Sequence, residues 1–325
     1  MTQSESSIKL LTMHDSPTVT FLPDFIKMLA TLRNVADAPL PIKTMLYVAS
    51  RLPRYRDFLQ RTSTRLIVLP NELSPEGSLI AAAAKRLGIH TLQYLHGTPT
   101  RLYTPSFSDS FWHWSKTTEQ TLGSSRSNNL KEIGALEFSD EFATPHYSAN
   151  TQSRTFNKIL FLDQSAGDEI WNTNAFGAVA DRTAQFAEEN PEFEIRVRLH
   201  PTTTTLKRAR LEATFPPNAV FTDQNTALST DINWADCCLT GSSSASFAAL
   251  QANKPTFLIW NSDLDSIHER PFLPSRYVIH QNESINKRIR EPIEITETQA
   301  IFQEVTNSEG AMERAATHIL ELIPR

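Results

Sequence analysis

The feature that most constrains the fold is an alternation of short apolar runs with longer helical segments. In the second half of the chain, strands are predicted at residues 158–162, 194–199, 219–222, 235–239 and 256–260, and helices at 173–190, near Lys207 and at 244–253. Short apolar runs without polar alternation are typical of strands buried on both faces. Strands that alternate with helices predict βαβ units and a parallel, doubly wound sheet.

The first half of the chain shows the same pattern less regularly. Buried strands are predicted at residues 45–48, 66–69, 91–95 and 111–114, with a shorter one at 132–133. Residues 75–87 predict a helix, because Ser74 can cap its start, Pro75 suits its first position and Gly88 ends it. We therefore expect an α/β protein with two Rossmann-like domains, parallel sheets and a cleft between them.

The chain length also indicates two domains, since 325 residues exceed the usual size of one hydrophobic core. Residues 139–157 are polar and aperiodic, which is typical of a linker. We expect an N-terminal domain over residues 1–145, a second domain over 146–307 and a C-terminal amphipathic helix over 308–325. Residues 1–40 show no recognisable pattern.

Composition excludes several function classes. The net charge of −5 gives no general reason to expect a nucleic acid partner. With nine glycines, the chain has neither a Gly-x-Gly-x-x-Gly turn after the first strand of either half nor a Walker loop, which disfavours dehydrogenases and P-loop ATPases. The adjacent Cys237 and Cys238 lie in a strand-like run and are expected to be small buried hydrophobes, without a disulfide framework or a zinc site.

Residues 1–9 lack the apolar core of a signal peptide, and the longest apolar run, at 79–84, is far too short to span a membrane. These observations predict a cytoplasmic protein. Peripheral contact with the inner face of a membrane stays compatible with them.

Polar groups follow two predicted strands of the second half, at the point where each strand ends. One motif is Arg198-Leu199-His200-Pro201, and the other is Gly241-Ser242-Ser243-Ser244. The carboxyl ends of parallel strands form the ligand-binding edge of such a sheet. An imidazole can donate to a phosphate, and serine hydroxyls with backbone N–H groups at a helix start can bind an anion. The pair predicts a nucleotide phosphate site, with a structural histidine and simple serine capping as the alternatives.

Other candidate residues follow neighbouring strands. Asp163 and Gln164 end the first strand of the second half, where a carboxylate could be a nucleophile, a base or a helix cap. His96, in His96-Gly97-Thr98-Pro99, could be a general acid or base, and Glu72 is an alternative carboxylate on the same rim. Glu269 could contact a ribose. For each, a purely structural role is the alternative.

These motifs resemble those of GT-B glycosyltransferases that build bacterial surface polysaccharides from CMP-sugars (Kdo or sialic acids) or CDP-glycerol. The resemblance covers roughly residues 72–260 and implies that His200-Pro201 and Ser242-Ser243-Ser244 hold a cytidine nucleotide, with Arg198, Gly241, Gln164 and Glu269 around it. It also implies that the domain at 146–307 binds the nucleotide-sugar donor. The domain at 1–145 would then face a glycan or glycolipid acceptor.

Two subfamilies compete. The stretch from Ile159 to Asp168 is similar to capsule-type retaining β-Kdo transferases, and in this resemblance Asp163 is the nucleophile of a double displacement. That family has a Glu-Asp-Gly carboxylate where this chain has Leu95-His96-Gly97. The His-Gly-Thr-Pro loop is instead similar to CDP-glycerol phosphotransferases, which implies His96 as the base of a one-step substitution.

We expect a transferase that moves a CMP-activated ulosonic acid onto a surface glycan without a metal or other cofactor. The Asp-x-Asp spacing nearest the site, Asp263-Leu264-Asp265, lies on the wrong loop for a metal. A CDP-glycerol-type phosphotransferase or an inverting transferase is the alternative. A non-catalytic nucleotide-sugar-binding subunit, which would need neither His96 nor Asp163, also stays open.

Overall fold

The computed structural model describes residues 42–70, 74–103, 106, 108–122, 129–138, 156–164, 173–223, 225–293 and 295–323. The chain divides into two compact units, Met1–Ser63 and Thr64–Arg325. In the first unit the described element is a helix, α2 (Ile42–Arg61). The strand predicted at residues 45–48 is therefore wrong. A four-residue apolar run fits either state, and the buried Leu52 and Leu59 continue the apolar pattern at the spacing of two helical turns.

The second unit begins with a four-stranded sheet. Its strands, in the spatial order β1-β2-β3-β4 and all parallel, are β1 (Leu66–Leu69), β2 (His90–Tyr94), β3 (Ser110–His113) and β4 (Leu130–Glu132). The connecting helices are α3 (Pro75–Arg86) and α4 (Lys116–Leu122). The predicted start of α3 is confirmed, because the Ser74 hydroxyl accepts the backbone N–H of Gly77 over 3.0 Å.

The second sheet has six parallel strands in the order β10-β9-β8-β5-β6-β7. They are β5 (Lys158–Leu162), β6 (Glu194–Arg198), β7 (Ala219–Phe221), β8 (Cys237–Thr240), β9 (Thr256–Ile259) and β10 (Val278–Ile279). The predicted α/β class with two parallel sheets is confirmed. Cys237 and Cys238 are free and fully buried, as predicted.

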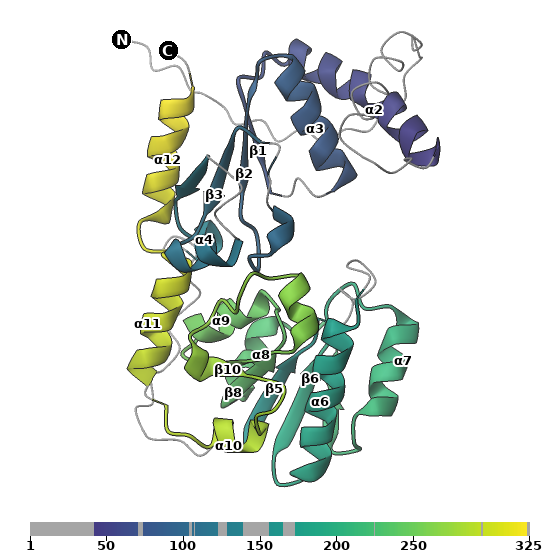
Figure 1. The fold of residues 1–325 in the computed structure, drawn as a ribbon, viewed down its shortest axis with the longest axis vertical. Coiled ribbons are helices and arrows are strands. Elements are labelled where there is room, and N and C mark those ends of the chain that lie inside the picture. The colour runs from purple at the N-terminus through teal and green to yellow at the C-terminus, as the bar shows by residue number, and fades with distance from the viewer. Residues whose placement is uncertain are drawn as a thin grey trace. The chain divides into compact units, whose positions relative to one another are not determined.

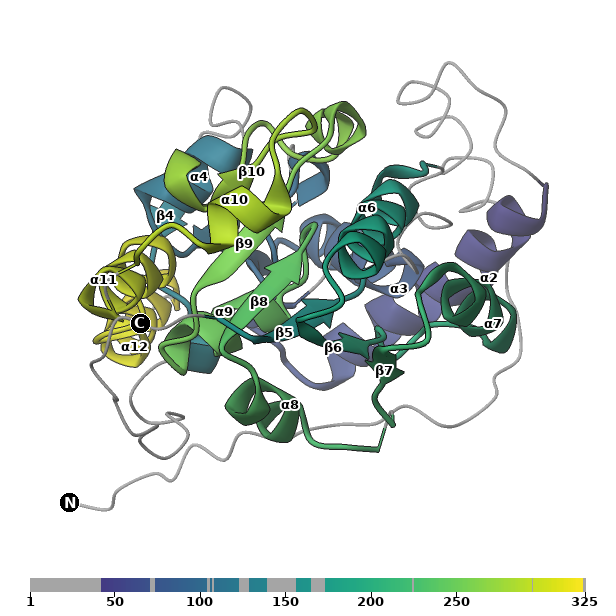
Figure 2. The same cartoon turned by 90° about the horizontal axis from the view of Figure 1, so that it is seen from below.

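Helices cover both faces of this second sheet (Figure 2). On one face, α6 (Ala175–Glu189) and α7 (Thr205–Thr214) pack on a cluster that includes Ile159 and Phe161, whereas α8 (Leu228–Trp234) and α9 (Ala245–Gln251) pack on Leu160 and Leu162. The chain moves outward from β5 through β6 to β7, then returns to β8 and moves outward the other way. The boundary between β5 and β8 is therefore the topological switch point of the sheet.

The chain ends in α10 (Ile285–Ile289), α11 (Ile295–Thr306) and α12 (Ala311–Leu322), and α12 returns to the first sheet (Figure 1). Ala315 of α12 packs with Leu92, Trp112 and Ile133, and the Trp112 indole N–H donates to Nδ1 of His318 over 2.9 Å. The helix expected within residues 308–325 is present as α12, which runs from Ala311 to Leu322. The last helix thus completes the core of a sheet formed two hundred residues earlier.

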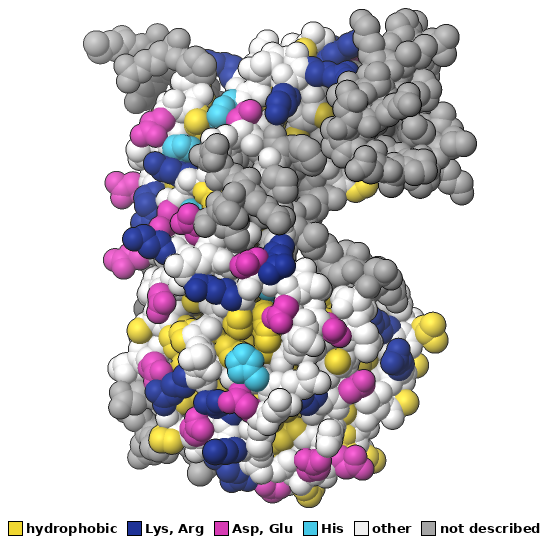
Figure 3. Space-filling model, in the orientation of Figure 1, with side chains coloured by type: hydrophobic (Ala, Val, Ile, Leu, Met, Phe, Trp, Pro, Cys, Tyr) yellow, Lys and Arg dark blue, Asp and Glu magenta, His cyan; other side chains and the backbone are white. Residues whose placement is uncertain are grey.

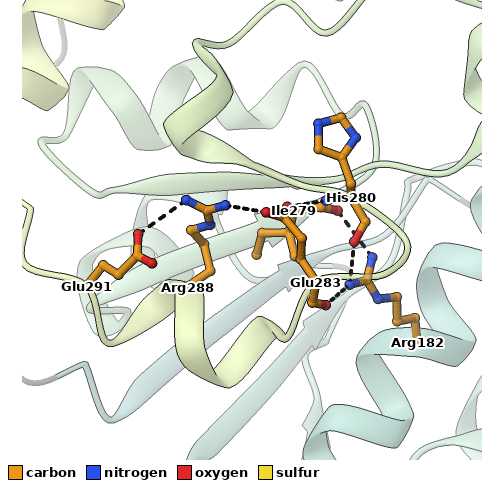
Figure 4. A network of polar contacts seen from close by, with 6 residues as sticks. All are labelled: Arg182, Ile279, His280, Glu283, Arg288 and Glu291. Carbon is orange, nitrogen blue, oxygen red and sulfur yellow. Dashed lines mark hydrogen bonds and ion pairs between the residues drawn. The ribbon is translucent and has the colours of Figure 1, made fainter.

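Arg182 of α6 fixes this helix to the turn after β10 (Figure 4). Its guanidinium donates to the carbonyl oxygens of Ile279 (3.2 Å), His280 (2.9 Å) and Glu283. Arg288 then pairs with Glu283 at 2.5 Å. Three backbone carbonyls satisfied by one guanidinium hold the edge of the second sheet against α6.

None of the helices in the described part of the chain is long and apolar enough to cross a membrane. On the face shown in Figure 3, basic and acidic side chains are interspersed over the surface.

Candidate functional site

The loop that begins at Asp163 lies between the two predicted phosphate-binding loops. Its strand, β5, pairs with both β6 and β8, so that Leu162 lies opposite both Arg198 and Thr240. The Asp163 N–H donates to the carbonyl of Arg198 over 2.9 Å, and the Thr240 hydroxyl donates to the carbonyl of Leu162 over 3.0 Å. The structure therefore brings Asp163, His200 and the serine motif to one edge of the second sheet, at its switch point.

Asp163 is 2% exposed, so its carboxylate is almost enclosed in this structure. The following residue, Gln164, has a buried side-chain oxygen that accepts no hydrogen bond from the described residues. A buried acceptor without a donor carries a desolvation cost that a ligand N–H or O–H would remove. Residues 165–172, which include Asp168, lie outside the described part of the chain.

Gly241 lets the serine motif lie directly against α6. A Cβ at this position would lie 3.2 Å from Val179 Cγ2 and 3.4 Å from Phe176 Cδ1. The 3.2 Å separation is tighter than most carbon contacts, so a side chain at this position would require Val179 or the loop to shift by a few tenths of an ångström. Gly241 therefore fits closely against α6 beside the switch point.

The three serines after Gly241 differ in their surroundings. The Ser242 hydroxyl is buried and lies 2.8 Å from Nε2 of His268. Ser243 is also buried, and its N–H donates to the hydroxyl of Thr240 over 3.1 Å. Ser244 is exposed and its side chain does not cap α9, which has seven residues. Of the three hydroxyls, Ser244 is therefore the one placed to meet a ligand from solvent.

His200 has a defined tautomer. Its Nδ1 accepts the backbone N–H of Thr202 over 3.2 Å and lies 2.7 Å from the Thr202 hydroxyl. Partial burial lowers the pKa of His200 below its ordinary value, which favours the neutral ring. Since Nδ1 accepts, the proton of the neutral ring is on Nε2, which can donate to a phosphate oxygen. The next residue, Pro201, is exposed.

Arg198 is held in a buried ion pair. Its guanidinium lies 2.6 Å from the carboxylate of Asp231, which is fully buried on α8, and donates to the carbonyl of Thr226 over 2.9 Å. Arg196 reaches the same carboxylate at 3.7 Å. In this structure the Arg198 side chain therefore joins β6 to α8, although sequence reasoning placed it around the nucleotide.

The loop after β2 contacts the serine motif. The Thr98 hydroxyl donates to the carbonyl of Ser242 over 2.9 Å, and a Cβ on Gly97 would lie 3.6 Å from that of Ser244. Gly97 has a φ of +85°, which favours glycine. His96 reaches solvent at its outer side. Nearby protein atoms partly desolvate the imidazole, which lowers its pKa below the ordinary value. The loop that carries His96 thus lies directly on the loop predicted to hold the phosphate.

Glu269 lies beside these loops but is paired. Its carboxylate is 2.9 Å from the Arg101 guanidinium, and both side chains are about half exposed. Glu72, the alternative acid or base, lies outside the described residues, as do residues 139–155 of the predicted linker. Within the described part of the chain, no three His, Cys, Asp or Glu side chains gather as metal ligands.

Two residues near these loops were missed by sequence reasoning. His268 is fully buried. Glu137 lies in a short 3₁₀ turn at Leu136–Phe138, where surrounding protein atoms desolvate its carboxyl and raise its pKa, an effect partly offset by the backbone N–H groups of Glu137 and Gly97. Neither His268 nor Glu137 directly follows an apolar run, and a polar residue after such a run was the pattern that indicated the other candidates. A carboxylate between two apolar residues gives no motif of its own.

Comparison with known proteins gives a likeness in structure alone. No protein-family model matches the sequence, and no curated protein is significantly similar to it. The structure is similar to that of UDP-GlcNAc 2-epimerase from Neisseria meningitidis bound to UDP-GlcNAc, with a TM-score of 0.53 over 92% of this chain and 89% of that chain, at 13% identity. The chain has the GT-B fold.

Two further structures support the GT-B assignment. MnaA of S. aureus, solved with UDP, gives a TM-score of 0.53 over 85% of this chain and 80% of that chain, at 13% identity. The pneumococcal O-GlcNAc transferase GtfA, solved with UDP and GlcNAc, gives 0.53 at 11% identity. The match to GtfA covers 85% of this chain and 61% of that chain, so this chain spans less than two thirds of the GtfA length.

Proposed function

We propose that the protein is a nucleotide-sugar-dependent glycosyltransferase whose donor binds at the carboxyl edge of the second sheet. One observation carries the proposal: Asp163, the His200 loop and the serine motif meet at the switch point between β5 and β8. Open parallel sheets bind their ligands at this point. The loop bearing His96 contacts the serine motif, which supplies an ionisable group from the first sheet.

The donor phosphate would be held by His200 and Ser244. Nε2 of neutral His200 donates without adding charge, and the Ser244 hydroxyl is exposed beside Gly97. The sequence resemblance favours a CMP-activated ulosonic acid of the Kdo or sialic type as the donor. The structural neighbours named above were instead solved with UDP or UDP-GlcNAc, so the donor base is the first property to test.

Two reaction routes fit the placed residues. In a retaining route, the Asp163 carboxylate attacks the anomeric carbon, and the nucleotide phosphate leaves with a hydrogen bond from His200. An acceptor hydroxyl, whose proton is taken by His96, then displaces Asp163. In an inverting route, His96 takes the proton of the acceptor hydroxyl as that oxygen displaces the nucleotide in one step. The lowered pKa of His96 favours the neutral imidazole, which is the form that can act as a base. His96 is also exposed to solvent, where an acceptor can reach it, whereas Asp163 is almost fully buried.

We propose a glycan or glycolipid of the bacterial surface as the acceptor, reached from the cytoplasmic side with peripheral contact to the membrane. Neither proposed route requires a divalent cation, because His200 and Ser244 can both donate to the phosphate. Addition of a chelator to the binding and turnover assays tests this part of the proposal.

A thermal-shift comparison of CMP, CDP, UDP and GDP tests the donor class. Stabilisation by CMP supports the ulosonic acid donor, and stabilisation by CDP alone favours a CDP-glycerol phosphotransferase. Stabilisation by UDP or GDP without either cytidine nucleotide overturns the cytidine assignment. If none of the four nucleotides stabilises the protein, the proposed donor site is wrong.

Intact mass spectrometry of the His96→Ala variant with the stabilising donor separates the two routes. A sugar adduct that disappears in the His96→Ala/Asp163→Asn double variant supports the retaining route. Absence of the adduct, with turnover lost in His96→Ala and kept in Asp163→Asn, supports the inverting route. Full turnover in both single variants contradicts both routes. Donor binding by the wild-type protein without any turnover supports the non-catalytic nucleotide-sugar-binding subunit instead.

The comparisons favour one further candidate. The match to UDP-GlcNAc 2-epimerase covers most of both chains, so the same edge of the sheet could serve an isomerisation of a UDP-sugar. Conversion of UDP-GlcNAc to a second UDP-sugar without any acceptor, followed by proton NMR, would support this candidate over the transferase.

A further inference from the structure

His268 forms a buried bridge between the serine motif and the loop after β2. It is fully buried, its Nδ1 lies 2.7 Å from the carbonyl oxygen of Pro99, and its Nε2 lies 2.8 Å from the hydroxyl of Ser242. The Trp260 ring lies beside the imidazole, with ring centroids 5.6 Å apart. The ring therefore has a polar partner on each nitrogen and an aromatic neighbour.

The partners fix the direction of both hydrogen bonds. A carbonyl oxygen can only accept, so Nδ1 carries the proton and donates to Pro99. Burial lowers the pKa of His268 to about 4, which keeps the ring neutral at physiological pH. Nε2 must then accept, and the Ser242 hydroxyl must donate to it. Ser242 consequently has no proton to donate to a phosphate.

Other bonds join the same loops around this bridge. The Thr98 hydroxyl donates to the carbonyl of Ser242, and the Arg101 N–H donates to the carbonyl of Ile267 over 2.8 Å. His268 is thus placed where the loops after β2, β8 and β9 meet. Through its two ring nitrogens, His268 contacts both loops named in the proposed function.

We propose that His268 is a positioning residue that holds the Ser242 turn and the loop carrying His96 in fixed relation, so that a donor on the serine motif faces His96 at a constant distance. This inference rests on the proposed function, since it assigns the donor to the serine motif. The two serines then have different roles, because Ser242 donates to His268 and Ser244 contacts the donor. A loss of the bridge should therefore reduce turnover more than nucleotide affinity.

Two variants separate the two halves of the bridge. His268→Asn places an amide N–H near the position of Nδ1 and keeps the bond to Pro99. His268→Gln places an amide oxygen near the position of Nε2 and keeps the bond from Ser242. If His268 acts through Ser242, we expect donor turnover in His268→Asn to fall at least about tenfold, the usual cost of one buried hydrogen bond, and His268→Gln to retain more activity.

The readout is hydrolysis of CMP-N-acetylneuraminate and of UDP-GlcNAc, measured per folded protein at a temperature below all melting transitions. The Kd for CMP and for UDP is measured by calorimetry on the same samples. His280→Asn is the matched control, because this exposed histidine forms its hydrogen bonds with Arg182 and Glu283 through its backbone. A drop in kcat in His268→Asn with a Kd changed less than threefold, and an unchanged control, supports the positioning role.

Several outcomes overturn the inference. If both His268 variants fold and match the wild type in kcat, or if only their melting temperature changes, His268 is structural and the proposed function stands. If the wild type binds neither nucleotide, the proposed function fails, and the positioning role fails with it. Long-range proton–nitrogen NMR reads the bridge without any ligand: a proton on Nε2, or a His268 that titrates near its ordinary pKa, contradicts the bridge itself.

Discussion

The hydroxyl of Thr98 donates a hydrogen bond to the carbonyl oxygen of Ser242 over 2.9 Å, across 144 positions of sequence. Both groups are buried, so neither has water as an alternative partner. The bond joins the loop after the second strand of one sheet to the loop at the switch point of the other. It therefore connects the two sets of residues on which the proposed transfer depends.

Removal of this hydroxyl gives the first prediction. Thr98→Val keeps the side-chain shape and leaves the Ser242 carbonyl without the Thr98 donor, so we expect the free energy of unfolding to fall by about 1–3 kcal/mol. Thr100→Val is the matched control, because the buried Thr100 hydroxyl has no hydrogen-bond partner among the described residues and its loss should be neutral or stabilising. Urea denaturation of both variants measures the difference. Equal losses would contradict the importance of the Thr98 bond.

The buried carboxylate of Asp231 gives the second prediction. Asp231→Ala leaves the guanidinium of Arg198 without its partner at 2.6 Å, and we expect a loss of about 3–5 kcal/mol in the free energy of unfolding. Glu212→Ala breaks an exposed pair with Arg208 on α7 and should cost less than about 0.5 kcal/mol. If Asp231→Ala has a small effect on stability but weakens nucleotide binding, Arg198 is instead a residue of the donor site.

Sequence patterns located the strand ends because strands of a parallel sheet are apolar throughout and polar residues resume where they stop. This rule found Asp163, His200 and the serine motif, which the structure brings to one edge. The rule does not show which way a side chain points. Arg196 and Arg198 lie two positions apart on β6, so they share a face of the sheet, and both reach Asp231 on α8.

Tertiary context decided the features that sequence missed. His268 lies in a loop without periodicity, and its partners Pro99 and Ser242 are 169 and 26 positions away, so no local pattern indicates the bridge. The run at residues 45–48 was too short to distinguish a strand from part of α2. The return of α12 to the first sheet depends on packing against Trp112, which an amphipathic pattern does not specify.

The pH dependence of stability gives the third prediction. The pKa of His268 is about 4 in the folded protein and about 6.5 in the unfolded chain. Between about pH 4 and about pH 6.5, this histidine is therefore protonated more in the unfolded chain than in the folded protein. Stability from this residue is therefore complete above about pH 6.5 and is lost as the pH falls toward 4, by about 3 kcal/mol in total. The difference in unfolding free energy between wild type and His268→Gln should narrow over this window. A difference that stays constant with pH would show that His268 does not titrate as the bridge requires.

Nucleotide binding by His200 gives the fourth prediction. His200→Ala removes the Nε2 donor, so we expect the Kd of the stabilising nucleotide to rise about tenfold or more, the effect of a hydrogen bond to a charged phosphate. Thr202→Val is the matched control, because it removes the hydroxyl beside Nδ1 but keeps the backbone N–H that selects the tautomer. The Kd of the nucleotide for Thr202→Val should change less than about threefold, since Nε2 of His200 keeps its proton.

Titration calorimetry at pH 7.5 measures nucleotide binding to both variants, and unfolding curves confirm that each is folded. If Thr202→Val weakens binding as much as His200→Ala, the hydroxyl of Thr202 is the phosphate ligand and His200 only orients it.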